Sequence, residues 1–292
     1  MPTLIVLSIL LFSAAPQAAA HGTEVHAGNL AWSFDPFVVY LLAVAGTLYV
    51  MGSWKLWQRS SAVHLSMAWR GIGFAAGWFT LAMALVSPLH WLGEHLFTFH
   101  MIEHEIIMAV SAPLFVLARP AAVFLWGLPN GIRRWIGGKM GTSPARAIWT
   151  GLTGGTVATI LHGVAIWGWH APALFDATVT NVALHRLQHL SFFVTAVLFW
   201  WAIRWRSDFG VAAWHVFLTM LHTALLGALI ALSPHVLYHA QTQAAGDWGL
   251  TPPEDQVLAG MVMWIPAGTI YAAAALGLIA SWILNSSRAR WT

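Results

Sequence analysis

Seven apolar segments, each long enough to cross a bilayer, constrain this chain more than any other feature of its sequence. A transmembrane helix needs roughly 20 apolar residues to cross about 30 Å of hydrocarbon. The segments cover residues 36–54, 69–89, 96–118, 147–169, 182–203, 211–234 and 257–284. Only 8% of the 292 residues are charged, against about 25% in soluble domains. Since only helices satisfy their backbone in lipid at this length, the sequence predicts an all-α, polytopic membrane protein with seven transmembrane helices.

The Lys and Arg residues predict how these helices are oriented. Twelve of the 13 basic residues fall on one side of the predicted membrane, and only Arg186 falls on the other. Short loops rich in Lys and Arg stay in the cytoplasm, so we expect the N-terminus outside and the C-terminus inside. Segment 120–140, interrupted at Pro129, Asn130 and Gly131, is expected to lie at the interface as an amphipathic stretch.

The two ends of the chain complete the predicted organisation. Residues 1–20, MPTLIVLSILLFSAAPQAAA, combine an apolar stretch with a small-residue ending typical of a signal peptide. An uncleaved N-terminal anchor is the alternative. A short outer segment would then occupy 21–35, the transmembrane domain 36–284, and a cytoplasmic tail 285–292.

The histidines are distributed unevenly across the predicted membrane. Twelve of the 15 histidines, and nine of the ten acidic residues, map to the outer side or the outer half of a span. Ionisable groups in a membrane are expensive and usually functional. With no cysteine in the chain, a metal site here would use imidazole, thioether or carboxylate groups.

Several outer histidines stand four residues apart, a spacing that places two imidazoles on one face of a helix. The pairs are His100–His104, His185–His189 and His235–His239. His162 and His170 frame the outer end of the fourth segment. We expect these helices to converge on an outer cavity.

Nearby methionines indicate which metal such a cavity would take. Imidazole suits Cu, Zn, Fe and Ni, whereas thioether favours Cu(I). Met101, Met108 and Met263 are the candidate sulfur ligands, with Met261 close by, although core filling is the ordinary role of methionine. Cleavage after Ala20 would add a second, surface site from His21 and His26 in HGTEVH.

Enzyme templates fit this sequence poorly, and we expect a protein that is not an enzyme. HMIEH is not the HExxH helix of metalloproteases, and no GxSxG elbow, phosphate-binding loop or dinucleotide fingerprint occurs. The few basic residues are dispersed without an aromatic-basic stripe, so nucleic acid is not an expected partner.

Three blocks resemble the CtaG-type cytochrome c oxidase assembly proteins: HMIEHEIIMAVSAPLFVL, GWHAPALFDATVTNVALHRLQHLSFFVTAVLFWW and DQVLAGMVMWIPAGTIY. The resemblance covers roughly residues 36–284. It implies a role in maturing haem-copper oxidases through copper delivery to the catalytic subunit, in a bacterial inner (plasma) membrane. The residues that match its motifs are His100, His104, His170, His185, His189 and Asp255. Gln188 stands where the family commonly has an acid, and Glu103 where it commonly has Gln.

The leading hypothesis is therefore a copper-binding assembly factor. Its expected partners are the oxidase catalytic subunit, a soluble outer-side copper chaperone, membrane lipid and further copies of the chain as a homo-oligomer. A haem-binding electron carrier is one alternative, with His90/His104 and His222/His235 as spaced ligands. A copper permease is another, although it would need ligands through the inner half as well.

Overall fold

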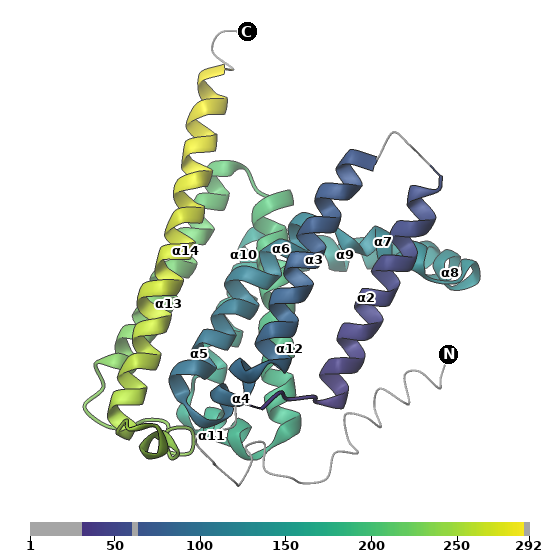
Figure 1. Ribbon diagram of the computed structural model, residues 1–292. Helices are drawn as coiled ribbons and strands as arrows, with labels where there is room; N and C mark the ends of the chain where they lie inside the picture. The colour runs from purple at the N-terminus through teal and green to yellow at the C-terminus, as the bar shows by residue number, and fades with distance from the viewer. Residues whose placement is uncertain (1–30, 60–63, 289–292) are drawn as a thin grey trace.

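The structure, a computed structural model, describes residues 31–59 and 64–288. These residues form an all-helical bundle without strands (Figure 1). The helices in chain order are α2 (Pro36–Trp57), α3 (His64–Val86), α4 (Pro88–His95), α5 (Phe97–Glu105), the π-helix η2 (Ile106–Ser111), α6 (Ala112–Ala118), α7 (Pro120–Gly127), α8 (Asn130–Met140), α9 (Ser143–Leu152), α10 (Gly155–Trp169), α11 (Pro172–Thr180), α12 (Val182–Trp205), α13 (Phe209–Ala231), the 3₁₀ turn η3 (Ala245–Trp248) and α14 (Pro252–Arg288). The all-α class is confirmed.

Six stretches of the described chain are long and apolar enough to cross a membrane. They correspond to six of the seven predicted segments, and the stretch Phe97–Ala118 combines α5, η2 and α6. The prediction at 147–169 differs, because α9 ends at Leu152 and α10 begins at Gly155. Two glycines at this junction favour the break. With 15 residues, α10 is about 22 Å long, shorter than the hydrocarbon layer.

Glycines allow two pairs of helices to approach closely. A Cβ atom at Gly260 of α14 would lie 2.6 Å from the Gly227 carbonyl oxygen of α13. A Cβ atom at Gly52 of α2 would overlap the Val123 carbonyl oxygen of α7. Small residues at membrane helix contacts let the backbones meet in this way. These contacts join α13 to α14 and fasten α7 against α2.

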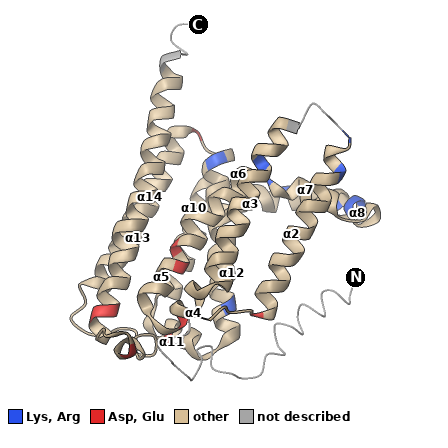
Figure 2. Ribbon diagram, in the orientation of Figure 1, with Lys and Arg blue, Asp and Glu red and all other residues tan. Residues whose placement is uncertain are grey.

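The charged residues are separated along the bundle. Lys and Arg lie mainly at the end of the bundle where α14 ends, and Asp and Glu lie mainly toward the other end (Figure 2). At the basic end, α7 and α8 run across the bundle, and α8 has no buried residue (Figure 1). The stretch expected at the interface, 120–140, is thus two short helices.

Arg186, the basic residue that stands apart from the others, is buried on α12. Its Nε donates to Asp35 Oδ2 at 2.8 Å. The Asp35 side chain also caps α2, accepting from the amide of Phe37 at 2.8 Å. A buried charge needs a partner of this kind, and here the partner ties α12 to the start of α2.

Candidate metal centre

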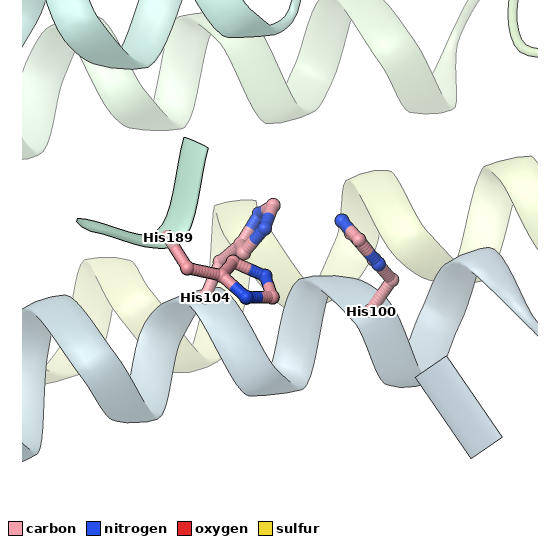
Figure 3. Close-up of side chains that lie close together, drawn as sticks. All are labelled: His100, His104 and His189. Carbon is pink, nitrogen blue, oxygen red and sulfur yellow. The ribbon is translucent and has the colours of Figure 1, made fainter. Parts of the chain in front are cut away.

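Three buried histidines converge between α5 and α12. His100 and His104 project from the same side of α5 because they are one helical turn apart, and His189 approaches from α12 (Figure 3). One nitrogen of each ring lies within 4.8 Å of the others. We call these three residues the histidine cluster. Their exposed fractions are 1%, 1% and 7%, so the cluster is closed to bulk water.

The chemistry of these rings suits a metal ion. Among the residues that the structure describes, neither nitrogen of His104 has a hydrogen-bond partner, nor does Nε2 of His189. Leaving buried polar atoms unpaired costs about 1–3 kcal/mol each, and a bound cation would remove that cost. Two nitrogens bound to one ion at about 2.0–2.1 Å lie no more than about 4 Å apart. Side-chain rotation that closes the cluster by about 1 Å would therefore complete the ligand geometry.

Two further histidines border the cluster. The His185 ring lies 4.4 Å from the His189 ring and 5.5 Å from the His100 ring, measured between centroids. The His170 ring lies 6.0 Å from the His104 ring. His170 Nδ1 is 2.7 Å from the Ile166 carbonyl oxygen, so Nδ1–H donates and the lone pair resides on Nε2. That nitrogen is buried without a partner in the described part of the chain, and its lone pair is available to a metal.

An acidic side chain lies directly beside the cluster. Glu103, fully buried on α5, accepts from His90 Nδ1 at 2.8 Å and lies 3.6 Å from His189 Nε2. Burial alone would lower the pKa of His90, but the carboxylates of Glu103, Glu94 and Asp35 raise it to about 9. Burial raises the pKa of Glu94 to about 7. His90 is therefore a cation that balances the Glu103 carboxylate.

Asp255 organises the helix that bears two of the cluster histidines. Its carboxylate accepts from the amide of Phe97 at 2.7 Å and the amide of Thr98 at 2.9 Å, and from the Thr98 hydroxyl at 2.7 Å. Leu96, the N-cap residue of α5, supplies no side-chain bond, so α14 caps α5 from outside. Such a carboxylate satisfies the free amides and complements the helix dipole.

A family model described as cytochrome c oxidase caa3 assembly factor (Caa3_CtaG) matches residues 47–284. The chain belongs to this family. No curated protein and no solved structure matches it. The matched region contains α5 and α12, and thus the whole histidine cluster. Of the histidines in the three sequence blocks that resemble this family, His100, His104 and His189 lie together in the structure, and His170 and His185 lie beside them.

Asp255 and the histidine pair on the sixth segment lie differently from the prediction. Asp255 was expected among the metal ligands, but both carboxylate oxygens serve α5 as its cap. His235 and His239 lie outside any helix and are exposed, because α13 ends at Ala231, before Pro234. The spacing of four places side chains on one face only within a helix, so this third pair does not converge on the cluster.

The other predicted ligands lie apart or outside the described residues. His162 is buried, contacts Thr195 through Nδ1 at 3.1 Å and stacks on Phe199. Met101, Met108 and Met263 belong to the apolar core, the ordinary position of methionine. His21 and His26, together with the expected signal peptide, fall outside the described residues.

His90 lies beside the cluster, a position that the sequence did not predict, since there His90 was named only as a ligand in the haem-binding alternative. It lies on α4, where Ser87 caps the helix and Pro88 occupies the first turn. Ser-Pro before an apolar stretch is a recognised helix start, and it places His90 and Glu94 one turn apart. This local signal was present, but the pairing of His90 with Glu103 depends on tertiary packing.

Proposed function

We propose that this member of the caa3 assembly factor family holds copper at His100, His104 and His189 and delivers it to the catalytic subunit of a haem-copper oxidase. One observation carries the proposal: three imidazoles from two helices meet in a closed, buried space. Copper is cargo in this role, and the protein performs no reaction on it. The uneven placement of charge favours the outer half of a bacterial plasma membrane as the position of the cluster.

The buried position of the histidine cluster favours Cu(I) over a divalent ion. The cost of taking an ion out of water grows with the square of its charge, so Cu(I) enters a buried site more easily than a divalent ion. Neutral imidazole is a suitable ligand for copper. The carboxylate of Glu103, which also pairs with the His90 cation, lies 3.6 Å from His189 Nε2 and attracts an ion held by the cluster without occupying a ligand position.

The bordering histidines suggest how copper leaves. His185 and His170 place further imidazoles next to His189 and His104, respectively. An ion held by three nitrogens can exchange one ligand at a time with such neighbours, so the barrier to release is divided into smaller steps. A protein that delivers its metal needs this lability, unlike one that keeps a resident cofactor.

Copper binding by the purified full-length protein tests the proposal. We expect one Cu(I) per chain by elemental analysis, and at least a tenfold loss of affinity in His104→Ala when measured against a Cu(I) chelator. His162→Ala is the matched control, because His162 is equally buried but lies outside the cluster. Equal affinities in the two variants would contradict the proposal. A Soret band in the visible spectrum would instead support haem binding.

In cells, the proposal predicts the copper content of the oxidase. We expect the oxidase from a strain carrying His104→Ala to contain less copper than the oxidase from a strain carrying His162→Ala, at equal amounts of assembly factor in the membrane. Normal oxidase copper content in the His104→Ala strain would rule out delivery from this cluster.

A further inference from the structure

An apolar cavity of about 390 Å³ lies between α2, α3, α7 and α12. On α12 a stripe with a spacing of four residues runs along its wall, formed by His185, His189, Phe193, Val197 and Trp201, and Arg186 and Leu190 line the cavity beside this stripe. The polar members of this wall, His185, Arg186 and His189, all lie toward its first turns. The cavity therefore begins beside the histidine cluster and continues as a hydrocarbon-like channel along the helix.

The dimensions of the cavity limit its occupant. From residue 185 to residue 201, α12 rises about 24 Å, so the cavity is long and narrow. A helix of that length, about 10 Å across, would fill on the order of 2,000 Å³, more than the approximately 1460 Å³ of space between the atoms that line the cavity. A transmembrane helix of a partner protein therefore does not fit inside, whereas a flexible hydrocarbon chain does.

The position of the cavity indicates where such a chain comes from. Its walls α2, α3 and α12 are all candidate membrane spans, so lipid is the surrounding medium. Water gains little in an apolar space, and an unfilled space loses the dispersion contacts of its lining. The polar residues Asp35, His90 and Arg186 line the cavity too, and all three lie near the ends of their helices at the acidic end of the bundle. This is the arrangement that a lipid requires, with its polar group at the interface and its tail in the membrane.

We propose that this cavity is a binding site for an acyl chain of a membrane phospholipid. The tail lies along the α12 stripe between Ala45 of α2 and Val197 of α12, and the polar end of the lipid lies near the Arg186–Asp35 ion pair. Because His185 and His189 belong to the same stripe, the bound lipid covers the side of the histidine cluster that faces this cavity. The site does not require copper to be present.

Native mass spectrometry of the full-length protein, delipidated and then titrated with dioleoylphosphatidylcholine, tests this site. Val197→Phe fills the cavity, and Val194→Phe makes the same change on the same helix at a position 46% exposed and outside the lining. Displacing about two methylene groups from the cavity weakens binding roughly tenfold. In the titration, we expect wild type and Val194→Phe to bind one phospholipid per chain, and Val197→Phe to lack this one-per-chain species.

Three results would overturn the proposal. They are equal binding in the two variants, phospholipid bound only as a statistical distribution without a one-per-chain species, and a prenylquinone in place of phospholipid when the protein is analysed before delipidation. If Val197→Phe does not fold, Ala45→Phe fills the cavity from α2 instead, and Val44→Phe, which is exposed on the same helix, is its control.

Discussion

Replacing Asp255 by alanine separates a capping role from a metal-binding role. The change removes the acceptor of two backbone amides at the start of α5, those of Phe97 and Thr98. Each buried donor left without a partner costs about 1–3 kcal/mol, so we expect the two to lower the free energy of unfolding by roughly 2–6 kcal/mol. The same change leaves all three imidazoles of the cluster in place, so one copper ion per chain should still bind at saturation.

Two measurements on the detergent-purified protein decide between the roles. Tryptophan fluorescence during heating reports stability, and elemental analysis after loading with Cu(I) reports capacity. Glu254→Ala serves as the control, since Glu254 is exposed and bonds only to nearby Thr251 among the described residues. A variant Asp255→Ala that melts like wild type but binds no copper would refute the capping argument and restore Asp255 as a ligand.

Three further predictions follow from contacts around the cluster. Gly93→Ala places a Cβ atom 2.9 Å from Glu103 Oε2, so the copper affinity of this variant should fall roughly tenfold in chelator competition. If the variant binds copper as tightly as the wild type does, the Glu103 carboxyl group moves aside freely. Gly260→Ala forces α13 and α14 apart, so the free energy of unfolding should fall by about 1–3 kcal/mol, which is measured as a lower Tm. His90 and Glu94 have folded-state pKa values of about 9 and about 7, above their ordinary values of 6.5 and 4.5. Their stabilising contribution is therefore complete at acidic pH and is lost as pH rises through these values, so Tm should fall between about pH 5 and pH 9, and less so in Glu94→Gln.

Hydropathy predicted the helices well wherever one uninterrupted apolar run exists. It did not detect the break between α9 and α10, because Thr153 and Gly154 are compatible with an apolar window. Hydropathy averages over about 20 residues, whereas a helix end depends on one or two. For the same reason the sequence did not show that α5 and α6 are joined by a π-helix.

The candidate site was predictable to the extent that it depends on local periodicity. His100, His104 and the pair His185–His189 lie on regular helices, so their spacing places each pair on one face. His235 failed this rule because the helix had already ended. The role of Asp255 was not predictable from spacing, since its partners stand 157 and 158 residues away in sequence. Long-range capping leaves no local pattern.

Two contacts hold α5, the helix that bears His100 and His104, one on each side of the histidine cluster. One turn before His100, Asp255 holds the first amides of α5. One turn after His104, the indole Nε1 of Trp200 donates to the Met108 carbonyl oxygen at 2.9 Å. Met108 belongs to the π-helix, which disturbs the regular hydrogen-bond ladder of an α-helix. Since Trp200 lies on α12, this bond ties together the two helices that carry His104 and His189. This bond and the Asp255 cap hold the backbones on which the three imidazoles of the histidine cluster stand.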